Sequence, residues 1–127
     1  MERNLVLDAG ALIGFERGSR VLAVMIEQIH ELDGETIVPA SALAQVWRGG
    51  PRSARLAQLL GGSDIDILDG EKAKEIGVRL GARGSNDIAD GHVACCAVER
   101  QAVVATSDRD DIEALIEPGE PVRLIAV

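Results

Sequence analysis

The chain has 127 residues, enough for one domain with one hydrophobic core and too few for two ordinary domains. Hydrophobic residues make up 46% and charged residues 27%, a mixture that excludes a disordered or collagen-like chain. With 13 lysines and arginines against 21 aspartates and glutamates, the formal net charge is −8, which excludes binding of nucleic acid through a broad basic face. We therefore expect one acidic globular domain over residues 1–127.

The hydrophobic pattern predicts five short strands that alternate with helices. The expected strands are 4–7, 36–38, 65–68, 102–105 and 122–127. The expected helices are 9–15, 19–32, 39–48, 52–60, 71–83, 87–100 and 108–116. This order is typical of an α/β domain with three layers, in which helices flank a mostly parallel central sheet of about five strands.

Two elements carry further expectations. In the third strand isoleucines alternate with Asp64 and Asp66, which predicts that the aspartates face water. In the following helix Ala73, Gly77 and Gly81 recur every four residues. We expect this stripe of small residues to pack against another helix of the same chain, and a dimer contact is the alternative.

The cysteines and the apolar runs bear on where the protein is found. Cys95 and Cys96 are adjacent in an aliphatic run, which predicts small buried side chains in a reducing compartment. A disulfide framework or a zinc site would need other spacings. No apolar run approaches the roughly 20 residues that span a bilayer, and the N-terminus has no signal-peptide pattern. We expect a cytoplasmic protein with no membrane partner.

Acidic residues follow the first and fourth predicted strands, at the edge where open α/β sheets bind ligands. Asp8 follows strand 4–7, and Asp108 follows strand 102–105. Each also precedes or begins a helix, where an aspartate ordinarily caps free backbone N–H groups. Both residues are therefore candidates for a ligand site, with helix capping as the structural alternative.

Asp90 is harder to explain by capping, because it lies three and four residues before Val93 and Ala94 on the expected core-facing side of a helix. A buried carboxylate without a partner is costly or becomes protonated. No lysine or arginine stands within four residues on that helix, and Asp87 adds a second negative charge. We expect a cation between the two carboxylates, unless Asp90 reaches water at the edge of the apolar stripe.

Three segments resemble the acidic blocks of PIN-domain ribonucleases, in particular the VapC-like toxins of bacterial toxin–antitoxin pairs. The segments are LVLDAGALI, DGHVACCA and VVATSDRDDI, and they occur in the family's order. The resemblance covers essentially the whole chain. It implies a PIN-like fold and a hydrolase that cleaves RNA phosphodiester bonds with Mg²⁺ or Mn²⁺. It also implies a homodimer and a cognate antitoxin as partners.

When the family's site residues are carried over by position, the resemblance implies that Asp8, Asp90 and Asp108 bind the metal and are catalytic. Carboxylate oxygens are hard ligands that suit Mg²⁺ or Mn²⁺ rather than zinc, and the two histidines are expected to be bystanders. Four further residues are auxiliary candidates: Thr106 and Ser107, which flank the last acid, and Asp87 and Asp111, which lie beside the acidic blocks, Asp87 also as a metal ligand.

The sequence departs from the family at the second acid, usually a glutamate in the helix after the second strand. Gln45 stands there, within PASALAQVWR. An amide can hydrogen-bond to a bound water, but it supplies no negative charge and no general base. We expect weakened metal affinity, with one metal instead of two or with Asp87 replacing the missing charge. A PIN fold that has lost catalysis and acts as a binding module is the alternative.

The only basic zone lies between Glu35 and Asp64, where no acidic residue occurs. Arg48, Arg52 and Arg55 lie in this zone. Guanidinium groups bind phosphates through paired hydrogen bonds, so these arginines are candidates for contact with RNA. Solvated arginines on helix surfaces are the alternative.

Other α/β classes fit less well. A phosphorelay receiver needs a lysine after a late strand, and the only lysines, Lys72 and Lys74, are elsewhere. A haloacid-dehalogenase-like phosphatase needs a second aspartate two residues after Asp8, where Gly10 stands. A phosphate-binding loop needs a glycine-rich run followed by Lys-Ser/Thr, which the sequence lacks.

Overall fold

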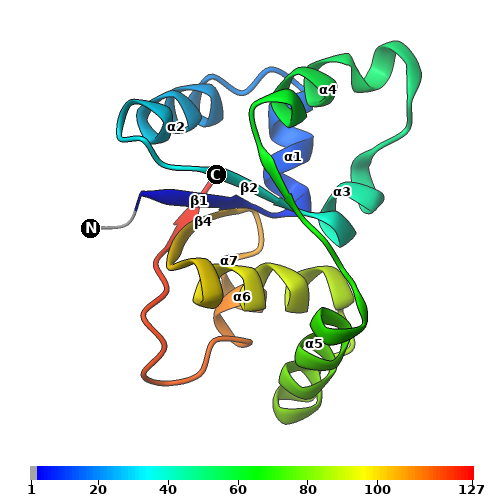
Figure 1. Ribbon diagram of the computed structural model, residues 1–127, viewed down its shortest axis with the longest axis vertical. Helices are drawn as coiled ribbons and strands as arrows, with labels where there is room; N and C mark the ends of the chain where they lie inside the picture. Colours follow the sequence, from blue (N-terminus) through cyan, green and yellow to red (C-terminus); the bar gives the residue numbers. More distant parts are fainter. Residues whose placement is uncertain (1–2) are drawn as a thin grey trace.

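A computed structural model describes residues 3–127 and contains one five-stranded sheet (Figure 1). The strand order is β3-β2-β1-β4-β5, and every neighbouring pair is parallel. The strands are β1 (Asn4–Leu7), β2 (Thr36–Pro39), β3 (Asp64–Asp66), β4 (Ala102–Thr106) and β5 (Leu124–Ala126). The predicted α/β class is confirmed, with a sheet that is parallel throughout.

Seven α-helices connect the strands within the described part of the chain. They are α1 (Ala9–Glu16), α2 (Arg20–Glu31), α3 (Ala40–Val46), α4 (Ala54–Gly61), α5 (Gly70–Arg83), α6 (Ile88–Arg100) and α7 (Arg109–Glu113), and a 3-10 turn, Gly50–Ser53, precedes α4. In Figure 1, α1, α2 and α4 lie on one side of the sheet and α6 and α7 on the other, where α5 packs against α6, while α3 contacts both α1 and α6. None of the helices in residues 3–127 is long and apolar enough to cross a membrane.

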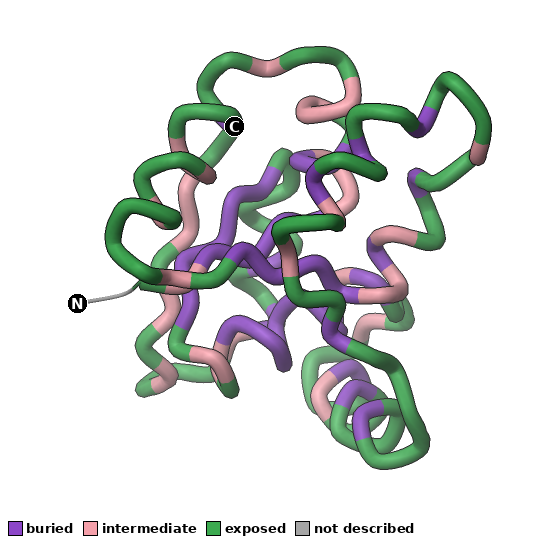
Figure 2. Tube along the Cα trace, turned by 45° about the horizontal axis from the view of Figure 1, so that its top comes forward, coloured by how far each residue is buried: buried purple, intermediate pink, exposed green. Residues whose placement is uncertain are grey.

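The core is formed by the three central strands and the inner sides of the helices. Val6, Ile37 and Val104, from β1, β2 and β4, have no exposed surface. Strands buried on both faces read as continuous aliphatic runs, as NLVL and AVVAT do. Figure 2 shows these buried strands enclosed by helices whose outer sides are exposed. Cys95 and Cys96 are buried free thiols on α6, as predicted.

The third strand departs from expectation at one of its two aspartates, because Asp64 is exposed as predicted but Asp66 is not. Asp66 is buried, whereas Ile65 and Ile67 are exposed at the edge of the sheet. The carboxylate of Asp66 finds partners on α6, among them His92, and these partners stabilise the inward orientation. The alternating pattern alone gave no sign of them.

The small-residue stripe on α5 does not pack within the chain, which corrects the first interpretation of it. Ala73, Gly77 and Gly81 are all exposed, and a Cβ added to either glycine would meet no atom within 4 Å. Gly91 on α6 makes the close helix contact instead, since a Cβ there would lie 2.9 Å from atoms of Ile76 and Leu80 on α5.

The chain reverses its direction of travel across the sheet at β1. It proceeds from β1 to β2 and β3 on one side, and then crosses to β4 and β5 on the other. In open parallel sheets the crevice beyond the carboxyl ends of the two strands at such a switch point is the usual ligand site. Here that crevice lies beyond β1 and β4.

Candidate functional site

Asp8 lies at the carboxyl end of β1 and is almost fully buried. Its Oδ1 accepts a hydrogen bond from the backbone N–H of Ala11 at 2.7 Å, and its Oδ2 accepts one from the hydroxyl of Thr106. Asp8 therefore caps α1, but the cap uses only one of the two oxygens. Burial raises the pKa of Asp8 from its usual value, and the hydrogen bonds from Thr106 and Ala11 oppose that rise.

Thr106 joins the ends of β1 and β4. Its hydroxyl donates to Asp8 and accepts the backbone N–H of Asp108 at 2.8 Å. The next residue, Ser107, also hydrogen-bonds to Asp8 through its backbone. Gly10 permits this close approach, because a Cβ at that position would lie 1.7 Å from Oγ of Ser107. Thr106 and Ser107 thus hold the first acid against the segment that carries the last one.

Asp108 and Asp111 differ from Asp8 in being exposed. Asp108 occupies the N-cap position of α7, yet its side chain makes no capping hydrogen bond. Asp111 lies one turn further along the same helix. The capping alternative is therefore realised at Asp8 and not at Asp108, whose carboxylate is left for other contacts.

Asp90 is partly buried in the first turn of α6. Asp87 is the N-cap of that helix, and its Oδ1 accepts the backbone N–H of Asp90 at 3.0 Å. Burial, followed by the negative charges of Asp87, Asp108, Asp8 and Asp111, raises the pKa of Asp90 to about 7. The acids singled out in the sequence are thus electrostatic neighbours, and those that act most strongly on Asp90 all repel its negative charge.

This donor set suits a hard divalent cation in its chemistry, because carboxylates supply it and their negative charges repel one another at Asp90. Within residues 3–127, no three histidine, cysteine, aspartate or glutamate side chains are already gathered in ligand positions around one point. Gln45 is exposed on the last turn of α3, a helix that contacts α6. The fit therefore rests on ligand type and charge, not on a preformed cage.

The three arginines of the basic zone are exposed and make contacts within the chain. Arg48 donates to the backbone carbonyl of Gln45 at 3.0 Å, at the end of α3. Arg52 forms an ion pair with Glu16 at 3.5 Å, and Arg55 donates to the carbonyl of Glu16 at 3.3 Å. The structure therefore brings Arg52 and Arg55 together at the end of α1, while Arg48 lies beside Gln45.

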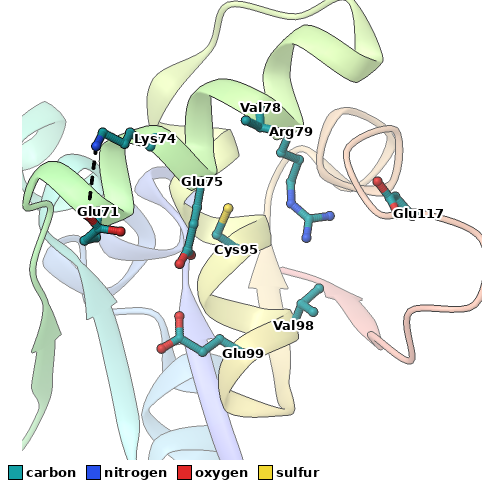
Figure 3. A pocket seen from close by; sticks show the side chains of 9 residues that line it. All are labelled: Glu71, Lys74, Glu75, Val78, Arg79, Cys95, Val98, Glu99 and Glu117. Atoms are coloured by element: carbon teal, nitrogen blue, oxygen red, sulfur yellow. Dashed lines mark ion pairs between the residues drawn. The ribbon is translucent and has the colours of Figure 1, made fainter.

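A pocket of about 560 Å³ lies between α5 and α6, lined by none of the candidate acids (Figure 3). Cys95 and Val98 contribute to its lining, together with the glutamates Glu71, Glu75 and Glu99. Figure 3 shows Cys95 on α6 facing the space between Glu75 and Arg79. The pocket combines acidic, basic and apolar groups, with Lys74 and Arg79 beside the glutamates, and lacks the polar residues at strand ends that mark the crevice of Asp8.

The sequence pattern missed one polar group. Asp66 was expected to face water, yet its carboxylate is buried and hydrogen-bonds to the ring of His92 at 3.0 Å. One signal was available, because His92, Cys96 and Arg100 recur every four residues on α6 and require a polar partner inside the fold.

No family model and no curated protein matches this sequence. Solved structures do match its fold. VapBC2 from Rickettsia felis, bound to a DNA fragment from its promoter, has a chain with a TM-score of 0.67 and 14% identity over 98% of both chains. The structure of FitAB bound to the IR36 DNA fragment contains a chain that matches with a TM-score of 0.62 and 18% identity, over 96% of this chain and 94% of that one.

A third match, FitAcB from Neisseria gonorrhoeae, has a TM-score of 0.56 and 20% identity, over 95% of this chain and 96% of that one. At such identities the likeness establishes the fold. The chain has a PIN-like α/β fold over its full described length, as the sequence resemblance implied.

Proposed function

We propose that this protein is a metal-dependent endoribonuclease and the toxin of a toxin–antitoxin pair. The observation that carries the proposal is the placement of Asp8 and Asp108 beyond the carboxyl ends of β1 and β4, with Asp90 beside them under net repulsion. An acidic cluster without a cation is destabilising, and a divalent ion offsets its charge. The PIN-like fold supports the same assignment.

In this proposal Asp8, Asp90 and Asp108 hold Mg²⁺ or Mn²⁺, with Asp87 and Asp111 as auxiliary acids. A bound ion would polarise a phosphodiester oxygen and lower the pKa of an attacking water. Thr106 fixes the orientation of the Asp8 carboxylate, and the backbone of Ser107 supports it. These contacts keep the first ligand in place before any substrate arrives.

The proposed partners follow from the fold and the charge. Two of the matching structures, VapBC2 and FitAB, are complexes with DNA, and the sequence resembles the VapC-like toxins of toxin–antitoxin pairs. We therefore propose a cognate antitoxin for this chain, one that places a basic residue near the acidic crevice, and a homodimer. Arg48 and Arg52, both exposed, are the proposed contacts for the phosphates of RNA, together with Arg55.

Aspartate-to-asparagine substitutions test the activity. Asp8→Asn and Asp90→Asn keep the size of the side chain and remove its charge, so Mg²⁺-dependent cleavage of RNA should fall at least about 100-fold. Growth arrest on expression of the chain alone should be relieved in the same variants. Asp110→Asn is the matched control, since Asp110 is an exposed acid of α7 in the turn that begins at Asp108. Cleavage and growth arrest that survive both site variants would refute the nuclease.

A binding module without catalysis is the second candidate, favoured by Gln45 in place of an acid. The two candidates separate on purified protein, because a binding module retains RNA and does not cut it at any Mg²⁺ concentration. The substitution Gln45→Glu should raise Mg²⁺ affinity if a carboxylate is what the nuclease site lacks. An unchanged affinity in Gln45→Glu would count against that role of Gln45.

A further inference from the structure

Asp66 is the last residue of β3, and as a whole residue it is only 8% exposed. It accepts hydrogen bonds from Nε2 of His92 at 3.0 Å and from Sγ of Cys96 at 3.3 Å. Nη1 of Arg100 lies 3.4 Å from it, and Nζ of Lys72, from α5, lies 4.0 Å away. Burial raises the pKa of Asp66, but the hydrogen bonds from His92 and Cys96 and the charge of Lys72 outweigh it and hold the pKa below its usual value. The carboxylate is thus fully partnered in its buried position.

Three of these partners lie on one side of a single helix. His92, Cys96 and Arg100 are spaced by four residues along α6, so successive turns of the helix face the same carboxylate. Rotation of α6 about its axis, or a slide by one turn, would remove three of the four partners of the buried Asp66 carboxylate and leave only Lys72 of α5, which is strongly destabilising. Buried polar groups of this kind can fix the register of packed helices.

The hydrogen bonds around Asp66 form a network that His92 extends from α6 to α3. Nδ1 of His92 lies 2.8 Å from the hydroxyl of Ser41, and the imidazole has no exposed surface. A neutral ring satisfies both contacts when Nε2–H donates to Asp66 and Nδ1 accepts from Ser41. Ser41 lies one helical turn before Gln45, and His92 lies two residues after Asp90. The chain of contacts therefore connects the helix of Gln45 with the helix of Asp90.

We propose that Ser41, His92 and Asp66 are positioning residues that set α3 and α6 at the angle the acidic site requires. Their effect on metal binding rests on the function proposed above, whereas their effect on the placement of α3 does not. The same residue types form nucleophilic triads in hydrolases. That role does not suit this chain, because a fully buried His92 cannot exchange a proton with a substrate.

The test uses Ser41→Ala, which removes one hydroxyl contact and leaves His92 and Asp66 paired with each other. Ser63→Ala is the matched control, since Ser63 is equally half-buried and its hydroxyl donates one hydrogen bond, to the carbonyl of Leu59 at 2.6 Å. Ser41→Thr keeps the hydroxyl and tests for rescue. Two properties are measured in the full chain: Mn²⁺ affinity by calorimetry, and acrylamide quenching of Trp47, the only tryptophan, which ends α3.

If the network positions the site, Ser41→Ala weakens Mn²⁺ binding by about tenfold, the lower end for groups that orient metal ligands. It also changes the quenching of Trp47, while Ser63→Ala changes neither and Ser41→Thr restores both. Equal thermal destabilisation in the two alanine variants, with Mn²⁺ affinity and quenching unchanged, would overturn the proposal. A parent chain that binds no Mn²⁺, but whose Trp47 quenching still responds to Ser41→Ala alone, would refute the nuclease and leave the positioning of α3 intact.

Discussion

At the scale of single residues, Gly10 leaves no room for a side chain beside Ser107, at the crevice that holds Asp8. A Cβ at Gly10 would lie 1.7 Å from Oγ and 2.6 Å from Cβ of Ser107, and a rotamer change relieves only the first overlap. Gly10→Ala should therefore destabilise the fold by about 1–3 kcal/mol, as overpacked sites do. Urea unfolding at neutral pH measures this loss.

The double variant Gly10→Ala/Ser107→Gly is the sharper version of this test. It removes both overlapping atoms, and the next nearest atom, Oδ1 of Asp8, is 3.5 Å away. The double variant should recover most of the stability lost in Gly10→Ala, a coupling expected only between residues in contact. If the stability losses of Gly10→Ala and Ser107→Gly simply added in the double variant, the close approach of α1 to the segment after β4 would be contradicted.

Residues differ in how far the sequence predicts their place. Asp8 and Asp108 follow aliphatic strands, so the geometry of parallel sheets was enough to place them at one edge. The position of Asp90 followed from helical spacing. The position of Asp66 could not be predicted, because its burial depends on His92 and Cys96, which lie 26 and 30 residues further along the chain. A contact between distant segments leaves no local pattern.

At the scale of elements, one ion pair ties the segment between α7 and β5 to α5. The guanidinium of Arg79 donates to both carboxylate oxygens of Glu120, at 2.6 and 2.8 Å, and to the carbonyl of Leu115. The hydrogen bonds from Arg79 lower the pKa of Glu120 to about 2. Because the folded-state pKa lies below the unfolded one, this pair stabilises the fold above about pH 4.5, and its contribution is lost as the pH falls toward 2.

Glu120→Gln should accordingly lower the free energy of unfolding at pH 7 by about 1–3 kcal/mol, the range for hydrogen bonds to charged groups. The difference from the parent should shrink when the pH is lowered to 3. Urea unfolding at both values measures it, with Glu113→Gln, an exposed acid of α7, as the control. A deficit that is the same at pH 7 and pH 3 would mean that the charge of Glu120 is not what stabilises this segment.

Elements were predicted well where a periodic pattern is long and less well where it is short. The helix expected over 71–83 is found as Gly70–Arg83, capped by Asp69 at its start and Gly84 at its end. The one expected over 52–60 is divided into a 3-10 turn and α4, because Pro51 and the positive φ angles of Gly49 and Gly50 shape the chain before it. The predicted exposure of Asp66 and the predicted packing of the small-residue stripe on α5 were wrong, since exposure at these positions depends on neighbouring elements.

At the scale of the whole molecule, the net charge of −8 makes the response to cations a sensitive measurement. Asp90→Asn removes a partly buried charge that neighbouring acids repel, so the metal-free variant should melt higher than the parent at pH 8, by about 4 °C. Added Mn²⁺ should raise the Tm of the parent by mass action and leave that of Asp90→Asn unchanged. Thermal melts with and without Mn²⁺ give both numbers.

Asp110→Asn is again the control and should keep the Mn²⁺-dependent increase in Tm. If Mn²⁺ raises the Tm of Asp90→Asn as much as that of the parent, the ion is bound elsewhere on this acidic surface. A lower Tm for metal-free Asp90→Asn would contradict the repulsion at the crevice.

The position of β4 in the sheet has a consequence for synthesis of the protein. β4 pairs directly with β1, joining Leu5 to Val103 and Leu7 to Ala105, so the first and last acids meet only after the ribosome has translated beyond residue 108. Pairing of strands that lie far apart in the chain slows folding, because the long loop between them must be closed first. A nascent chain that already contains β1, β2 and β3 thus holds Asp8 but neither Asp90 nor Asp108. If the protein is the proposed toxin, its cell is protected from it during translation, before any antitoxin has bound.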